Sequence, residues 1–186
     1  MNTPNKLTVI RMVLVPVFML FMGFGDIGMQ IAGLAIFIIA SITDWLDGYL
    51  ARRDGLVTNF GKFMDPLADK MLTTAAFLVL MDMGYISSWV LLIILFREFL
   101  VSGIRLIAVG EGKVIAASIW GKAKTVSQMI AIIASFVLVI APWFNEWDFL
   151  LINIMVWIST ALTLISGADY LIKNKDFVKV KNNEKN

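Results

Sequence analysis

Long apolar runs separated by short polar connections make up most of this chain. About six of these runs approach the 20 residues that cross roughly 30 Å of hydrocarbon at 1.5 Å per residue. They cover residues 7–24, 29–50, 63–81, 87–109, 119–142 and 149–172. The pattern therefore predicts six transmembrane helices and an all-α integral membrane protein.

The composition agrees with a protein that lies in a bilayer. Hydrophobic residues make up 59% of the chain and charged residues only 16%, which is too little polar surface to cover a soluble globule. We find no linker, low-complexity tract or fixed-period repeat that would divide the chain. We therefore expect one six-helix membrane domain over residues 1–172 and a basic cytoplasmic tail over residues 173–186.

The cationic residues indicate how the spans are oriented. With six spans, both termini and the loops after the second and fourth spans lie on one side of the membrane. That side collects Lys6, Arg11, Arg52, Arg53, Lys62, Lys113, Lys122, Lys124 and the lysines of residues 173–185. The opposite loops contain Asp26, Asp82, Glu146 and Asp148 but no Lys or Arg. By the positive-inside rule, we expect a multi-pass protein of the cell membrane with both termini in the cytoplasm.

Carboxylates gather at the cytoplasmic ends of the second and third predicted spans. Asp44 and Asp47 are three residues apart on one span, and Asp65 and Asp69 are four apart on the next. Each pair therefore lies on one helix face. The short connection over residues 53–60 makes the two helices antiparallel neighbours. Single acids near helix ends are often solvated caps, but this joint spacing favours four converging carboxylates.

Such a carboxylate group needs cations in a medium of low dielectric constant. Because the chain contains no Cys and no His, any metal must bind oxygen, which favours hard divalent ions such as Mg²⁺. Gly48 and Ala51 continue the first acidic face and Gly61 continues the second, so small residues leave room for a ligand to approach the backbone closely. Arg52 adds a guanidinium group, whose paired donors suit phosphate. These features predict a diphosphate-binding pocket with two metal ions at the cytoplasmic face.

The same residues form a recognisable signature. At fixed spacing it consists of Asp44, Asp47, Gly48, Ala51, Arg52, Gly61, Asp65 and Asp69. This pattern resembles the signature of the CDP-alcohol phosphatidyltransferases, with every position filled. The resemblance implies a metal-dependent membrane enzyme of six helices, usually a homodimer. Such an enzyme moves a phosphatidyl or related group from a CDP-linked donor to an alcohol and releases CMP.

The resemblance also implies a role for each signature residue. Two Mg²⁺ or Mn²⁺ ions would be bound by Asp44, Asp47, Asp65 and Asp69. Asp69 would in addition be the general base. The segment NKLTVIR resembles the N-terminal Asn-x-x-Thr-x-x-Arg element of the family and suggests that Asn5 and Thr8 lie near the nucleotide. The residues expected to bind the CDP-linked donor are Asn5, Thr8, Asp47, Gly48, Ala51, Arg52 and Gly61.

Cations in the second half of the chain suggest the nature of the acceptor. Arg97 and Glu98 fall about 15 Å along the fourth span, where a charge is expected to face a cavity or a partner. As sequence neighbours they do not face each other well enough to pair alone. Arg105 follows on nearly the same face, and Lys122 and Lys124 begin the fifth span. An anionic acceptor would explain this cluster, although positive-inside topology alone could supply the lysines.

The segments REFLVSGIR and WGKAKT resemble the phosphatidylglycerophosphate synthases of the family. This implies CDP-diacylglycerol as donor and glycerol 3-phosphate as acceptor. Serine, an inositol phosphate or phosphatidylglycerol are alternative acceptors, and a small cation transporter is a rival class, since transporters also carry intramembrane carboxylates. Bilayer lipids and a second copy of the chain are the expected partners, and no nucleic acid is expected.

Overall fold

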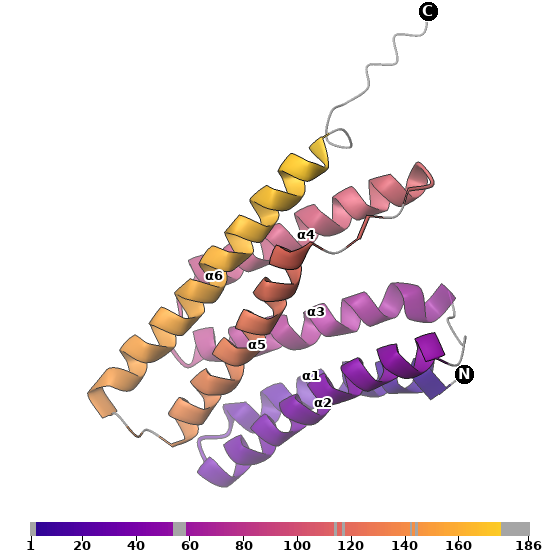
Figure 1. Ribbon diagram of the computed structural model, residues 1–186. Helices are drawn as coiled ribbons and strands as arrows, with labels where there is room; N and C mark the ends of the chain where they lie inside the picture. The colour runs from indigo at the N-terminus through magenta and orange to yellow at the C-terminus, as the bar shows by residue number, and fades with distance from the viewer. Residues whose placement is uncertain are drawn as a thin grey trace, which may run out of the picture.

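The computed structural model describes residues 3–53, 59–113, 115–116, 118–141, 143 and 145–175, and within these ranges the side chains of residues 3–5, 44–53, 59–63, 65–66 and 145 are outside the description. Helices fill this part of the chain, and no strand occurs in it (Figure 1). The helices are α1 (Thr3–Gly23), α2 (Ile27–Arg53), α3 (Asn59–Asp82), α4 (Ser88–Gly110), α5 (Ile119–Ile140), the short 3-10 helix η1 (Asn145–Trp147) and α6 (Asp148–Lys173). The six α-helices confirm the six predicted helical segments.

Three helices contain stretches that are long and apolar enough to cross a bilayer. These stretches are Lys6–Gly23 of α1, Ile119–Ile140 of α5 and Asp148–Lys173 of α6. The helix α4 has a comparable length but contains Arg97, Glu98 and Arg105 within its apolar sequence. Charged residues inside an apolar helix are expensive in lipid and therefore mark a protein-lined polar site.

The helices form two groups of three. In the first group α1 packs against α2 and α3, and in the second α6 packs against α5 and α4. The groups meet where α3 contacts α4 and α5 and where α2 contacts α5 (Figure 1). The helix α3 therefore lies at the junction, with neighbours from both groups.

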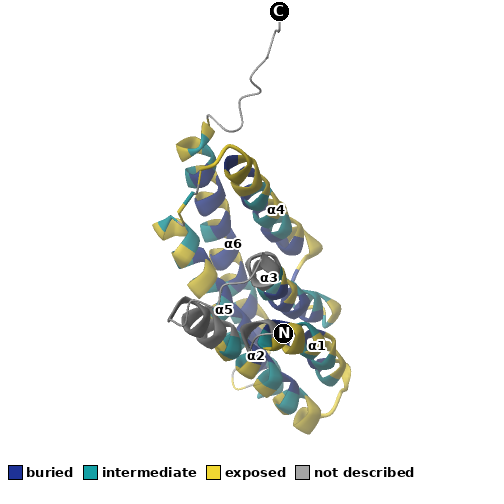
Figure 2. Cartoon of the chain, turned by 90° about the vertical axis from the view of Figure 1, so that its right-hand side faces the viewer, coloured by how far each residue is buried: buried dark blue, intermediate teal, exposed yellow. Residues whose placement is uncertain are grey.

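An aromatic cluster joins the two groups inside the bundle. Phe18 of α1, Phe37 of α2 and Phe136 of α5 are fully buried. Their ring centroids lie 5.5, 5.7 and 6.4 Å apart in tilted or edge-to-face arrangements, which stabilise such pairs by about 0.5–1.5 kcal/mol each. Buried residues face the inside of the bundle and exposed apolar residues face outward (Figure 2), as a lipid environment requires.

Small and polar residues line the contact between α5 and α6. Gln128 Nε2 donates to Thr163 Oγ1 at 3.1 Å, and Ser135 and Ser159 are fully buried nearby in the same two helices. Lipid tails are as apolar as leucine, so transmembrane helices associate through close packing and interhelical hydrogen bonds. This contact fixes α5 against α6 and so determines where the N-terminal end of α5 lies.

Serine caps fix the starts of α4 and α5. The Ser87 Oγ accepts from Trp89 N at 3.3 Å, and the Ser118 Oγ accepts from Gly121 N at 3.1 Å. Each cap satisfies a backbone donor that the first turn of a helix leaves unpaired. Because α5 starts directly after Ser118, Lys122 and Lys124 lie in its first turns.

Candidate active site

The acidic signature positions lie at one end of the bundle. Asp44 and Asp47 are in the last turns of α2, and Asp65 and Asp69 are in the first turns of α3. The start of α1 lies at the same end (Figure 1). The helices α2 and α3 contact each other, so the two acidic segments belong to neighbouring helices, as predicted.

Most of the predicted donor and metal ligands lie outside the described side chains. These residues are Asn5, Asp44, Asp47, Gly48, Ala51, Arg52, Gly61 and Asp65. Among the side chains that are described, no group of three or more Asp, Glu, His or Cys could bind a metal ion. The convergence of four carboxylates therefore stays a prediction, and Asp69 is the member whose surroundings can be examined.

Asp69 lies among charged residues from several helices. It is partly buried and interacts electrostatically with Lys124 of α5, Arg11 of α1, Glu98 of α4 and its neighbour Lys70. The predicted base is therefore placed where the cations of the second half of the chain meet the acidic end of α3. This juxtaposition brings together the two sets of residues that the sequence indicated separately.

Glu98 is the common partner of three cationic side chains. Lys124 Nζ donates to Glu98 Oε1 at 2.5 Å, and Arg97 Nη1 donates to the same oxygen at 3.1 Å. Lys70 Nζ lies 4.0 Å from Glu98 Oε2. We call Lys70, Arg97, Lys124 and Glu98 the Glu98 cluster. It connects α3, α4 and α5, and its two most buried side chains, Lys124 and Arg97, are only 8% and 10% exposed.

Arg97 confirms the expectation that an arginine at this depth has a protein partner. Its Nη2 donates to Ser166 Oγ of α6 at 2.7 Å, and Gly167 gives it room, since a Cβ there would lie 3.0 Å from Arg97 Cγ. Arg97 and Glu98 also contact each other although they are adjacent in sequence. They meet because the long guanidinium group reaches round the helix and because Lys124 binds the same carboxylate oxygen.

Arg105 and Lys122 lie apart from the Glu98 cluster. Arg105 Nε donates to Tyr170 OH at 3.3 Å, and its guanidinium carbon is 5.7 Å from the centre of the Tyr170 ring. These contacts hold the Arg105 side chain of α4 against α6, within electrostatic range of Lys70. Lys122 is exposed, because residues two apart on a helix point to different sides. Its part in acceptor binding stays a prediction.

Sequence analysis missed three residues of this site. Lys70 directly follows Asp69, the last residue of the signature, and its Nζ donates to Ser102 Oγ of α4. Glu98 was considered only as a neighbour of Arg97. Arg11 completes the N-terminal Asn-x-x-Thr-x-x-Arg element and is fully buried, as Thr8 is one turn earlier. In each case the available signal was a charge inside an apolar segment, next to a motif position.

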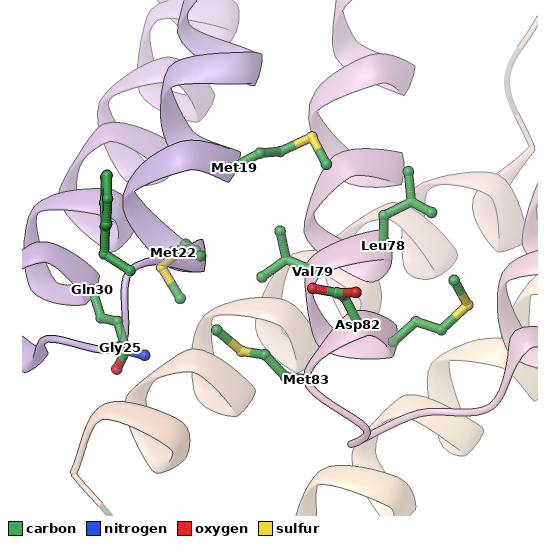
Figure 3. Close-up of a pocket in the computed structure, with 11 residues that line it drawn as sticks. Met19, Met22, Gly25, Gln30, Leu78, Val79, Asp82 and Met83 are labelled. Carbon is green, nitrogen blue, oxygen red and sulfur yellow. The ribbon is translucent and has the colours of Figure 1, made fainter.

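A cavity of about 580 Å³ lies at the other end of the bundle. Figure 3 shows Met19 and Met22 of α1, Leu78 and Asp82 of α3 and Gln30 of α2 around it. It is formed by the end of α1, the start of α2 and the end of α3, far along these helices from the acidic segments. The cavity has no part in the arrangement around Asp69.

Comparison with known proteins adds independent information. A family model described as CDP-alcohol phosphatidyltransferase matches residues 1–165. A CDP-diacylglycerol–glycerol-3-phosphate 3-phosphatidyltransferase of Bacillus subtilis is 42% identical over 97% of this chain and 99% of its own length. An enzyme of the same name from Rickettsia bellii is 37% identical over 91% of the chain and 93% of its length. A probable phosphatidylglycerophosphate synthase of Mycobacterium tuberculosis is 40% identical, over 92% and 81% respectively.

Proposed function

The chain belongs to the CDP-alcohol phosphatidyltransferase family, and from this premise we propose that it is a phosphatidylglycerophosphate synthase. It transfers a phosphatidyl group from CDP-diacylglycerol to glycerol 3-phosphate and releases CMP, a step of phospholipid biosynthesis. The observation that carries this conclusion is the 42% identity to the Bacillus subtilis enzyme over nearly the whole of both chains. Similarity of that extent includes both the acidic helices and the cationic ones.

The electrostatics of the site favour a phosphorylated acceptor. Lys70, Arg97 and Lys124 come together around Glu98, and Lys70 and Lys124 also interact electrostatically with Asp69. A phosphomonoester carries about −1.5 to −2 charges near pH 7. Serine or another acceptor without a phosphate would leave these cations with Glu98 as their main anionic partner. Glycerol 3-phosphate supplies the negative charge and carries a primary hydroxyl that can reach toward Asp69.

Asp69 acts in this proposal as the general base. Its carboxylate takes the proton from the primary hydroxyl of glycerol 3-phosphate, and that oxygen attacks the β-phosphorus of CDP-diacylglycerol. A new phosphorus–oxygen bond forms, the bond to the CMP oxygen breaks, and CMP leaves with the electron pair. The support for this role is the place of Asp69, which lies within electrostatic range of Lys70 and Lys124.

The donor set of the signature fits hard divalent metal ions. Asp44, Asp47, Asp65 and Asp69 offer only oxygen ligands, and the chain has no Cys or His to favour a softer metal. They would bind two Mg²⁺ or Mn²⁺ ions, which when bound supply positive charge to the diphosphate. The residues proposed to border the CDP group are Asn5, Thr8, Asp47, Gly48, Ala51, Arg52 and Gly61.

We also propose that the active site faces the cytoplasm and that the enzyme is a homodimer. The cationic loops support this orientation, and the acyl chains of the donor can then stay in the inner leaflet while the diphosphate reacts at the interface. The dimer rests on the resemblance to the family. The apolar outer faces of the helices are compatible with lipid and with a second copy.

A direct assay tests the function. Purified protein in detergent is incubated with CDP-diacylglycerol, Mg²⁺ and a radiolabelled acceptor, and we expect phosphatidylglycerophosphate and CMP with glycerol 3-phosphate only. Serine, inositol phosphate and phosphatidylglycerol serve as competing acceptors. Transfer to one of these instead would reassign the acceptor.

Metal-dependent CMP release in detergent, without a transmembrane gradient, excludes the transporter alternative. Removal of metal by a chelator should stop the reaction until Mg²⁺ or Mn²⁺ is restored.

A further inference from the structure

The Glu98 cluster brings three cations onto one carboxylate. Lys70 comes from α3, Arg97 from α4 and Lys124 from α5, and each lies within 4.0 Å of a Glu98 oxygen. The Glu98 side chain is itself only 14% exposed. Glu98 therefore occupies the point where positive charges from three helices meet.

Like charges in this position need a carboxylate to stay together. Lys124 and Arg97 are nearly buried, where water screens their mutual repulsion poorly. Removal of one partner from a buried ion pair leaves an uncompensated charge, which drives the remaining side chain away from its place. Without the Glu98 charge, the charged ends of the three side chains would therefore no longer be drawn to one point.

The cluster retains an excess of positive charge. Three cationic side chains and one carboxylate leave a surplus of two positive charges among these four residues. This surplus matches a phosphate monoester, which approaches two negative charges near pH 7. Glu98 thus reduces the repulsion between the cations without cancelling their attraction for a dianion.

We propose that Glu98 is a positioning residue of the acceptor site, which holds Lys70, Arg97 and Lys124 in the arrangement that binds the phosphate of the acceptor. This inference rests on the proposed function, because it presumes a phosphorylated acceptor. It adds Lys70 to the residues that bind the acceptor, and Lys70 is the residue next to the proposed base. The cluster thereby fixes the acceptor phosphate relative to Asp69.

The helices have other contacts that hold them together around Glu98. Lys70 also donates to Ser102, and Arg97 also donates to Ser166. These bonds connect α3 with α4 and α4 with α6 whatever the charge at position 98. A purely structural role for Glu98 would affect stability and all kinetic constants alike, whereas a positioning role should affect mainly the acceptor.

The first test is Glu98→Gln in the full-length enzyme, compared with Glu111→Gln as the matched control. Glu111 is exposed at the C-terminal end of the same helix. We expect Glu98→Gln to raise the KM for glycerol 3-phosphate roughly tenfold or more, because hydrogen bonds between charged groups are lost. The KM for CDP-diacylglycerol should stay within about twofold of wild type. The Glu111→Gln control should keep the wild-type KM values for both substrates.

Glu98→Asp keeps the charge and is the variant to use if Glu98→Gln does not fold. Its carboxylate is withdrawn by about 1.5 Å, so it cannot keep the contacts to Lys124 and Arg97 at 2.5 and 3.1 Å together. We expect a several-fold rise in the KM for glycerol 3-phosphate, smaller than that of Glu98→Gln. A wild-type KM in Glu98→Asp would overturn the proposal.

A double-mutant cycle shows whether Glu98 acts through the cations. If it does, the effect of combining Glu98→Gln with Lys124→Met on the KM for glycerol 3-phosphate should be clearly smaller than the sum of the two single effects. Additive effects, or equal shifts in the KM values of donor and acceptor, would reject the positioning role. A wild-type enzyme that does not use glycerol 3-phosphate would instead reject the proposed function, so the two failures are distinct.

Discussion

Gly167 of α6 leaves the space that the Arg97 side chain occupies. A Cβ at position 167 would lie 3.0 Å from Arg97 Cγ and 3.9 Å from Arg97 Cβ. The first distance is a few tenths of an ångström shorter than an ordinary contact, so Gly167→Ala should push the Arg97 side chain away from Ser166 and Glu98. Overpacking of this kind in a well-packed interior costs about 1–3 kcal/mol.

Gly103→Ala is the matched control, because Gly103 is also a helical glycine and a Cβ there would meet nothing within 4 Å. Both changes gain the same helix propensity, about 1 kcal/mol. The difference between the two variants therefore isolates the contact with Arg97. We expect Gly167→Ala to be less stable than Gly103→Ala by about 1–3 kcal/mol and to have a higher KM for glycerol 3-phosphate.

Thermal unfolding in detergent and initial rates at varied glycerol 3-phosphate give the two measurements. Gly103→Ala should match or exceed wild type in stability and should keep its KM. If Gly167→Ala behaves like Gly103→Ala in both assays, then Arg97 is not held by the α6 surface and takes no part in acceptor binding. A loss of stability with an unchanged KM would retain the packing argument and remove the functional one.

Three further predictions concern single side chains. Asp69→Asn should abolish turnover and leave binding of CDP-diacylglycerol largely intact in a lipid-binding assay; normal turnover would exclude Asp69 as the base. Arg105→Ala should raise the KM for glycerol 3-phosphate more than that for the lipid donor, and equal shifts would place Arg105 outside the acceptor site. Lys124→Met should weaken acceptor binding more than Lys122→Met, because Lys124 is buried against Glu98 whereas Lys122 is exposed; the reverse order in steady-state kinetics would contradict the observed cluster.

The number and order of the helices could be predicted because the apolar runs are long. The ends of the helices could not be predicted with the same accuracy. The first run starts at residue 7 but α1 begins at Thr3, and the third starts at residue 63 but α3 begins at Asn59. Hydropathy reports which residues can lie in hydrocarbon, whereas a helix continues into the polar interface as long as its backbone hydrogen bonds are formed.

The candidate site was only partly readable from the sequence. Spacing along one helix placed Asp65 and Asp69 together, since that relation depends on local geometry alone. The meeting of Lys70, Glu98 and Lys124 depends on how three helices rotate and pack against one another. Apolar faces that contact lipid and apolar faces that contact protein look alike in sequence, so these rotations could not be inferred.

The arrangement in two groups of three helices has an evolutionary consequence. The family signature lies entirely on α2 and α3 of the first group, whereas Arg97, Arg105 and Lys124 lie on α4 and α5 of the second. In the proposed site, a change of alcohol therefore requires substitutions mainly in the second group, together with Lys70 of α3, and the proposed residues of phosphoryl transfer in the first group can be inherited unaltered. Chimeras that exchange the C-terminal three helices between relatives should then exchange substrate preference as well.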